Sequence, residues 1–246
     1  MPPLTQSKSR FGPPINIEQE MRTGAIAYWQ GEYYQSRADK DGVSLLDYIH
    51  ALFGLIAQKK PQTVLMIGCA GGSLATMLTR IGSTVVAVDV NPQSFLLARR
   101  YFGLPDTVQC RVADGLDFLF STRRMFDAIV LDAFRGGDIP EALISDVLFA
   151  QARKRLHKDG AIFANIHVKS DKDDAADRVA TCMGQTFANV RILDRPGTKH
   201  RNVIVMAGAV RGLKSPKLLM APRIESRLIV RILEAMQFRP RKRPAA

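Results

Sequence analysis

A glycine-rich loop is the first feature of the sequence with a clear chemical meaning. The segment GCAGG at residues 68–72 directly follows a short apolar run at residues 63–68. Glycines at such a turn let the backbone bend sharply and approach a ligand closely, and the free N–H groups of a following helix suit a polar or anionic ligand. Many turns of this kind contain glycine for packing alone, so the loop by itself leaves both interpretations open.

Two aspartates follow at positions where a carboxylate can bind a nucleoside. Asp89 ends the next apolar run, about 20 residues after the loop begins, where it can accept hydrogen bonds from both hydroxyls of a ribose. The alternative is a solvated aspartate that caps the next helix, although Asn91 can do this instead. Asp114, which Gly115 follows, can accept a hydrogen bond from the amine of an adenine, or it can cap the helix that begins there.

A third aspartate, Asp132, ends the apolar run at residues 126–132. Successive parallel strands end at the same edge of a sheet, and open α/β proteins bind their ligands at that carboxyl edge. Asp132 is therefore expected near the reactive end of a nucleoside that lies across the first three strands. There it can act as a general base or bind a cationic amine. Capping of a loop or a helix is the alternative use of this side chain.

The elements that must position these residues follow a regular alternation of strands and helices. Short apolar runs are typical of buried parallel strands, and the last connection lacks a helix, so the final strand is expected to be antiparallel. The pattern predicts an α/β fold with a doubly wound, mostly parallel sheet of seven strands, of the class I methyltransferase type. The expected strands are residues 63–68, 84–90, 108–113, 126–132, 161–168, 188–194 and 202–208, and the expected helices include residues 44–58, 115–121, 140–156 and 171–185.

The chain divides into three parts by composition. Residues 1–43 comprise a polar, Pro-rich arm, expected to be mobile over residues 1–22, and a small appendage rich in aromatic side chains. Residues 44–210 form the expected nucleoside-binding α/β domain, and residues 211–246 form a basic helix and tail. The aromatic cluster is expected to pack as a local core, with a pocket wall or a homodimer interface as alternatives. The cluster consists of Tyr28, Trp29, Tyr33 and Tyr34.

The positive charge is concentrated at the C-terminal end. The formal net charge is +12, and residues 211–246 hold ten Lys/Arg against two Asp/Glu. A helix docked on the domain or on a partner subunit is favoured over a site for a polyanion, so nucleic acid is the less favoured partner. The helix combines an apolar stripe with a basic one: Ile224, Leu228, Ile232, Leu233 and Met236 beside Arg223, Arg227 and Arg231.

Several classes of site are not expected from the remaining residues. The three cysteines form no CxxC pair and the four histidines lack metal-ligand spacing, so no protein-bound metal is expected. Cys69 is expected to be a small buried residue rather than a nucleophile. His167 ends an expected strand at the sheet edge where the ligand is expected, but a single histidine does not indicate a catalytic role. No apolar segment is long enough for a membrane span, and none has the pattern of a secretory signal, so the chain is expected to be cytoplasmic.

Taken together, the motifs resemble those of the spermidine synthases and their uncharacterised relatives. The most specific part is ARRYFGLP at residues 98–105 followed by DG-x-x-FL from Asp114, because general methyltransferases share the glycine loop and the acid but seldom this stretch. FDAIVLDAFRGGDIP at residues 126–140 and RNVIVMAG at residues 201–208 extend the resemblance, which covers about residues 44–208.

The resemblance implies a ligand class and a role for individual residues. The ligand is S-adenosylmethionine, its decarboxylated form, or methylthioadenosine. Asp89 is assigned to the ribose, Asp114 to the adenine, and Asp132 to the position of the family's catalytic acid. The expected nucleoside-binding residues are Gly68, Ala70, Gly71, Asp89, Val90, Asp114 and Gly115.

Three departures from the family's motifs bear on the substrate. The family's GGGDGG loop has an aspartate that helps to hold the amine of the aminopropyl donor, and Gly71 stands in its place here. After Asp132 the second acid, Asp138, is out of register, and Arg135 adds a cation. The family's Tyr-His-Glu run becomes Tyr-Ile-His at residues 48–50. A diamine carries two positive charges and needs carboxylates around it, so typical use of putrescine is not expected.

The sequence therefore predicts a spermidine synthase-like transferase that moves a methyl or an aminopropyl group from a sulfonium donor to a small-molecule acceptor. Asp132 is the expected base near the nucleophile. The alternatives are a non-catalytic relative that keeps the nucleoside cleft and a nucleic-acid methyltransferase. The second of these is disfavoured because no Asn/Asp-Pro-Pro-Tyr motif follows the fourth strand.

Overall fold

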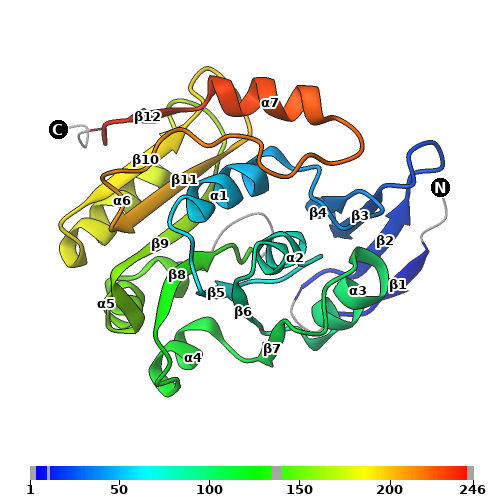
Figure 1. Ribbon diagram of the computed structural model, residues 1–246, viewed down its shortest axis with the longest axis horizontal. Coiled ribbons are helices and arrows are strands. Elements are labelled where there is room, and N and C mark those ends of the chain that lie inside the picture. Colours follow the sequence, from blue (N-terminus) through cyan, green and yellow to red (C-terminus); the bar gives the residue numbers. More distant parts are fainter. Residues whose placement is uncertain (1–3, 10–11, 135–139, 243–246) are drawn as a thin grey trace.

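The computed structural model describes residues 4–9, 12–134 and 140–242 (Figure 1). Within these residues the chain forms an eight-stranded sheet with helices on both faces and a separate four-stranded sheet near the N-terminus. Arg135 and Asp138, which the sequence analysis singled out, lie outside the described residues.

The eight-stranded sheet has the predicted α/β topology. Its parallel strands, in the order β7-β6-β5-β8-β9, are β5 (Thr63–Ile67), β6 (Thr84–Asp89), β7 (Gln109–Val112), β8 (Phe126–Leu131) and β9 (Leu156–Val168). β11 (Arg201–Gly208) lies between β9 and β10 (Val190–Asp194) and is antiparallel to both, as predicted. A short eighth strand, β12 (Gln237–Arg239), pairs with β10 and was not predicted.

Helices cover both faces of this sheet, because alternate residues of each strand point to opposite sides. Val64 and Met66 of β5 pack into the core on one face, whereas Leu65 and Ile67 pack into the core on the other. The first core is closed by α1 (Asp47–Ala57), α2 (Ser73–Arg80), α3 (Pro92–Phe102) and α7 (Ser226–Ala235). The second core is closed by α4 (Gly115–Ser121), α5 (Asp146–Arg155) and α6 (Ala175–Thr186).

The helix expected over residues 140–156 is divided into two. A short 3-10 helix (Glu141–Ile144) precedes α5, because the hydroxyl of Ser145 accepts a hydrogen bond from the N–H of Leu148 and starts a new helix there. β9 then begins at Leu156, earlier than expected, and pairs with β8 across an irregularity in register. The change does not affect the carboxyl ends of these strands.

Residues that were expected to form a mobile arm instead belong to a second sheet. Its four antiparallel strands, in chain order, are β1 (Thr5–Ser7), β2 (Ile15–Gln19), β3 (Ile26–Gln30) and β4 (Tyr33–Ala38). Ile15 and Ile17 are fully buried, because alternate residues of β2 pack against Phe102 of α3. Tyr28 joins this core, as expected, and Figure 1 shows the sheet beside α3.

The C-terminal helix α7 docks beside α1. It buries Ile229 and Leu233, whereas Leu228, which was expected on the apolar stripe, is 53% exposed. Leu233 and Met236 are buried as expected, and Ile229 takes the buried place that was expected for Leu228. Arg223 forms an ion pair with Asp41, which holds the segment before the helix against the rest of the chain.

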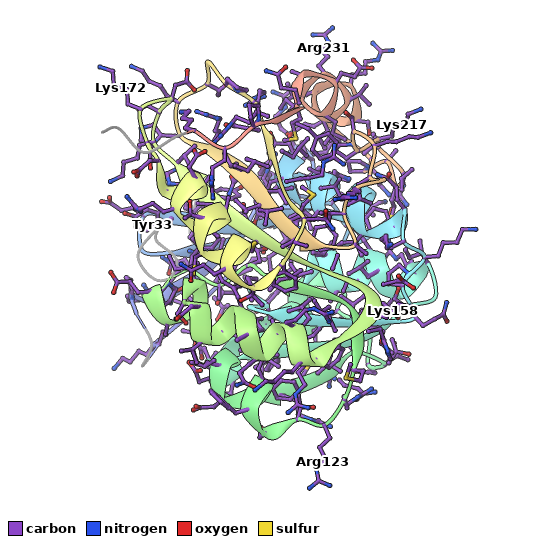
Figure 2. All side chains as sticks on the ribbon, turned by 90° about the vertical axis from the view of Figure 1, so that its left-hand side faces the viewer. Tyr33, Arg123, Lys158, Lys172, Lys217 and Arg231 are labelled. Atoms are coloured by element: carbon purple, nitrogen blue, oxygen red, sulfur yellow. The ribbon has the colours of Figure 1, made fainter. Side chains whose placement is uncertain are left out.

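Arg227 and Arg231 of α7 are exposed, and so is Arg223 before the helix, so the three residues of the expected basic stripe lie at the surface. In Figure 2 the labelled basic side chains project from separate sides of the molecule: Arg123, Lys158, Lys172, Lys217 and Arg231. Arg239 is used internally instead, because it pairs with Asp177 and with Asp194.

None of the described helices is long and apolar enough to cross a membrane. The longest of them, α6, has 12 residues, whereas a span requires about 20.

Candidate nucleoside and group-transfer site

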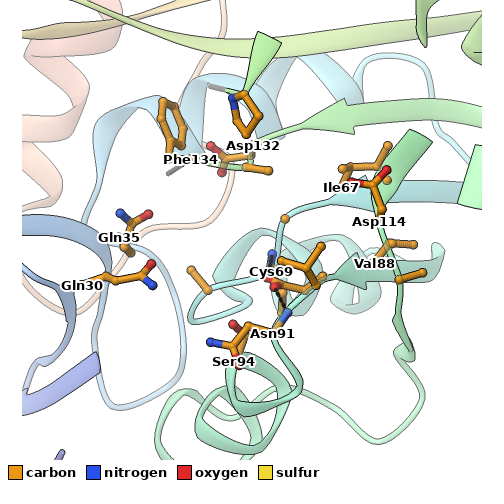
Figure 3. Close-up of a pocket in the computed structure, with 18 of the residues that line it drawn as sticks. Gln30, Gln35, Ile67, Cys69, Val88, Asn91, Ser94, Asp114, Asp132 and Phe134 are labelled. Atoms are coloured by element: carbon orange, nitrogen blue, oxygen red, sulfur yellow. Dashed lines mark hydrogen bonds between the residues drawn. The ribbon is translucent and has the colours of Figure 1, made fainter. Parts of the chain in front are cut away.

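A cavity of about 290 Å³ opens at the carboxyl edge of the parallel strands (Figure 3). The loops after β5, β6, β7 and β8 form most of its wall, and the N-terminal sheet closes another side. The structure brings every predicted site residue except Gly71 to this cavity: Gly68, Ala70, Asp89, Val90, Asp114, Gly115 and Asp132.

Gly68 is required by a close approach of two strand ends. Its φ is +97°, and a Cβ at this position would lie 2.2 Å from the carbonyl oxygen of Asp132. The N–H of Asp132 also donates a hydrogen bond of 2.9 Å to the carbonyl of Ile67, the residue before the glycine. The close contact between Gly68 and the backbone of Asp132 therefore explains the glycine and brings Asp132 beside the glycine loop.

Gly71 does not line the cavity, and packing accounts for the glycine at this position. Its N–H donates a hydrogen bond of 3.0 Å to the hydroxyl of Ser36 on β4. A Cβ at position 71 would lie 2.8 Å from atoms of both Ser36 and Phe102. The N-terminal sheet and α3 thus fill the space that a side chain at position 71 would need.

Asp89 is held by the loops on either side of it. Its carboxylate accepts a hydrogen bond of 3.0 Å from the N–H of Cys69 and one of 2.8 Å from the N–H of Asn91. Burial raises the pKa of Asp89, and these backbone hydrogen bonds oppose the rise. Asn91 caps α3 by accepting a hydrogen bond from the N–H of Gln93, so Asp89 is not needed as the cap.

Asp114 caps a helix and also lines the cavity, so the capping role does not exclude the ligand role that the sequence left open. Its Oδ1 accepts hydrogen bonds from the N–H groups of Leu116 and Asp117, at 2.8 and 3.2 Å, and so caps α4. The same residue lines the cavity. Capping uses only Oδ1 of the carboxylate, so Oδ2 stays available to a ligand.

Asp132 is oriented by a chain of side chains from neighbouring strands. The amide nitrogen of Asn165 on β9 donates a hydrogen bond of 2.8 Å to Asp132 Oδ1. The amide oxygen of Asn165 in turn accepts one of 2.9 Å from Asn202 on β11. This second bond fixes which end of the Asn165 amide faces the carboxylate. Asn165 is fully buried.

The surroundings of Asp132 make it a stronger base than an ordinary aspartate. Burial raises the pKa of Asp132 to about 6, and the hydrogen bonds from Asn165 and from Tyr48 on α1 oppose the rise. A carboxylate with this pKa is mostly ionised at neutral pH and can still accept a proton readily.

Sequence reasoning missed several residues that line the cavity. Gln30 and Gln35 come from the N-terminal sheet and lie on the opposite side from Asp114 in Figure 3. Tyr28, for which a pocket wall was an alternative, also lines the cavity, so it serves both the local core and the pocket wall. The aromatic cluster was the one available signal, because no motif connects the glutamines to the glycine loop.

Cys69 and His167, which the sequence analysis did not favour as catalytic residues, lack the surroundings that catalysis would need. Cys69 is buried, and burial raises the pKa of its thiol, so the reactive thiolate is disfavoured. His167 is not among the cavity residues, and its ring stacks on that of His200 at a centroid distance of 5.7 Å.

Comparisons with known proteins agree with this architecture. Residues 64–160 match the model of a methyltransferase domain. A polyamine aminopropyltransferase of Chromobacterium violaceum is 31% identical over 206 residues, which cover 79% of this chain and 76% of the relative. A polyamine aminopropyltransferase of Neisseria meningitidis is 32% identical over 213 residues, which cover 83% of this chain and 79% of the relative.

The fold is also that of a solved relative. A probable spermidine synthase from Corynebacterium glutamicum superposes with a TM-score of 0.78 at 18% identity, covering 98% of this chain and 92% of that one. The identity to the two curated relatives, over most of their length, goes beyond a shared fold. The chain therefore belongs to the polyamine aminopropyltransferase family, with the class I methyltransferase fold.

Proposed function

We propose that the protein is a transferase that binds an S-adenosyl sulfonium compound in the cavity and transfers a methyl or an aminopropyl group to a small acceptor. The observation that carries this proposal is the convergence of Asp89, Asp114 and Asp132 on one cavity at the carboxyl edge. Asp89 binds the ribose hydroxyls, Asp114 binds the adenine amine, and Asp132 faces the sulfonium end. The family membership supports the same ligand class.

The bound sulfonium supplies an electrophilic carbon and leaves as a neutral thioether, so the protein must provide positioning and a base. In this proposal Asp132 accepts the proton that the acceptor's nitrogen or oxygen loses as its bond to the carbon forms. A pKa of about 6 supports this role. Asn165 and Tyr48 keep the carboxylate in one orientation while the proton is transferred.

The donor that fits best is S-adenosylmethionine itself. A donor without a carboxylate presents a lone ammonium, which needs an acid near the glycine loop. Position 71, where the family has that acid, is closed by Ser36 and Phe102 in this chain. Losing one partner of a desolvated charge typically costs a few kcal/mol. We therefore expect S-adenosylmethionine to bind at least as tightly as its decarboxylated form, and putrescine to be a poor acceptor.

Calorimetry with the purified protein tests this proposal. S-adenosylmethionine, its decarboxylated form and methylthioadenosine are titrated in parallel. We expect all three to bind, with S-adenosylmethionine at least as tight as the decarboxylated form. Absence of binding by all three would exclude the proposed ligand class, and a clear preference for the decarboxylated form would exclude the proposed donor.

Aminopropyl transfer from the decarboxylated donor is the second candidate, and the names of the curated relatives favour it. In that case Asp132 has to replace the acid that position 71 lacks. Efficient formation of spermidine from putrescine and decarboxylated S-adenosylmethionine would establish this candidate. Binding of the nucleosides without turnover of any acceptor would favour a non-catalytic relative.

A further inference from the structure

A second cavity, of about 340 Å³, lies at the end of the eight-stranded sheet where β10 and β12 pair. α6 forms one side of it, and the residues that follow β12 form another. In Figure 1 these elements lie at the far end of the molecule from the N-terminal sheet. The cavity shares no wall residue with the nucleoside cavity. Pockets that bind small molecules have volumes of about 300–1,000 Å³, so this cavity has room for a ligand of its own.

The inner wall of this cavity is apolar. Ala180 of α6, Phe187 just after this helix and Ile192 of β10 line it, and each of them is at most 5% exposed. Gly184 of α6 leaves further space, because a Cβ at this position would meet no atom within 4 Å. Removal of apolar surface from water is favourable, so a ligand with an apolar body gains free energy by entering.

The polar part of the wall is cationic. Three arginines line the cavity, whereas none of the described Asp and Glu residues does. Arg239 is already neutralised, because it pairs with Asp177 and Asp194. Arg191 and Arg241 donate only to backbone carbonyls and a hydroxyl, and neither forms an ion pair within the described part of the chain. The cavity wall therefore carries two positive charges that lack a counter-ion among the described residues.

Arg191 is held in place by neutral groups. Its Nη1 donates hydrogen bonds of 3.1, 3.3 and 2.6 Å to the carbonyls of Val210, Arg211 and Leu213. Its guanidinium carbon lies 3.4 Å from the centroid of the Phe238 ring. Burial lowers the pKa of Arg191, and no carboxylate of the described residues opposes this effect. A partly buried cation without a counter-ion is unfavourable, and a bound anion would relieve this cost.

We propose that this cavity binds a small amphipathic anion, whose acidic head lies against Arg191 and Arg241 and whose apolar body lies against Phe187 and Ile192. The planar guanidinium group suits a carboxylate or a phosphate head. An inorganic anion would leave the apolar wall in water, and a neutral or cationic amphiphile would leave the two arginines unpaired. The proposal does not depend on the proposed function, because the two cavities have no residue in common.

An amide-detected NMR titration of the labelled protein with octanoate tests this site. The readout is specific to positions in the chain, so it also detects weak binding. We expect saturable shifts confined to Gly184, Ile192 and their neighbours in the cavity wall. Octyl phosphate is titrated in parallel, and the tighter of the two ligands identifies the preferred head group. Octylamine and octanol should bind at least about tenfold more weakly, because they cannot accept hydrogen bonds as an anion does.

Gly184→Leu is the variant that fills the cavity. Its melting temperature should not fall, because leucine has a higher helix propensity than glycine and the position has open space. We expect this variant to lose the saturable shifts with octanoate. Gln185→Leu is the matched control, because it places the same side chain on the next, exposed residue of α6, which does not line the cavity. This control should bind octanoate as the wild type does.

Arg241→Gln tests the charge separately from the space. It should weaken the binding of octanoate and leave that of octanol unchanged, because only the anion interacts with the guanidinium. Three outcomes would overturn the proposal: shifts that spread over the surface without saturation, octylamine binding as tightly as octanoate, and unchanged octanoate binding in Gly184→Leu. Loss of binding in both leucine variants would also overturn it, because the effect would then not come from the cavity.

Discussion

Replacement of Asn165 by alanine is expected to raise the pKa of Asp132. The amide of Asn165 donates a hydrogen bond of 2.8 Å to the carboxylate, and this bond stabilises the charged form. A hydrogen bond to a charged group contributes about 1.5–3 kcal/mol, which corresponds to about one to two pKa units. Starting from a pKa of about 6, Asp132 in the variant should titrate at about pH 7 or higher.

The assay is a carbon-detected NMR titration of the side-chain carboxyl groups in the free protein, which requires no knowledge of the acceptor. The Asp132→Asn variant identifies the signal. Asn202→Ala should shift the pKa in the same direction by a smaller amount, because Asn202 only fixes the amide of Asn165. Asn189→Ala, which changes an exposed contact with Arg211, should have no effect. An unchanged or lowered pKa in Asn165→Ala would refute the assigned role of this amide.

Three further outcomes are expected. Asp89→Ala should weaken methylthioadenosine binding at least about tenfold in calorimetry. It should also lower the melting temperature by a few degrees, because the N–H groups of Cys69 and Asn91 lose their acceptor. An unchanged dissociation constant would remove the ribose assignment. The pKa of Asp132 is raised above its ordinary value of 3.8, so the folded state binds this proton more tightly than the unfolded state, and stability falls as pH rises from about 4 to about 6. In urea denaturation, the free energy of unfolding of Asp132→Asn should therefore exceed that of the wild type by up to about 3 kcal/mol at pH 8, and the two should be equal below pH 4. Equal free energies of unfolding at pH 8 would contradict this burial effect. Alanine at the exposed Arg231 of α7 should leave both the melting temperature and retention on heparin unchanged, and a clear loss of retention would favour a polyanion site.

The parallel sheet was predictable because its strands are buried on both faces. Runs such as that of β5 are continuously apolar, and glycine or Asn-Pro signals mark their ends. The N-terminal sheet was not predictable on these grounds. Its strands are short, they mix polar and apolar residues, and their burial depends on a contact with α3 that lies far along the chain. β12 has three residues, too few to show a period.

The site was predictable where motifs mark the ends of successive strands. Asp89, Asp114 and Asp132 were found because each ends an apolar run or opens a helix at the same sheet edge. Asn165 was missed because it lies inside the apolar run of β9, where nothing in the sequence indicates that its partner is Asp132, the residue after β8. The loop motif does not reveal that Gly71 lies outside the cavity wall, because its N–H donates to Ser36 on the distant strand β4.

The central claim is that the nucleoside lies across β5, β6 and β7 with its sulfur end toward Asp132. A crystal structure of the protein with bound S-adenosylhomocysteine tests this most directly. The account predicts ribose hydroxyls within about 3 Å of the Asp89 carboxylate, the adenine amine within the same distance of Asp114, and the sulfur facing Asp132. A nucleoside bound outside this cavity, or one whose ribose makes no contact with Asp89, would contradict the account.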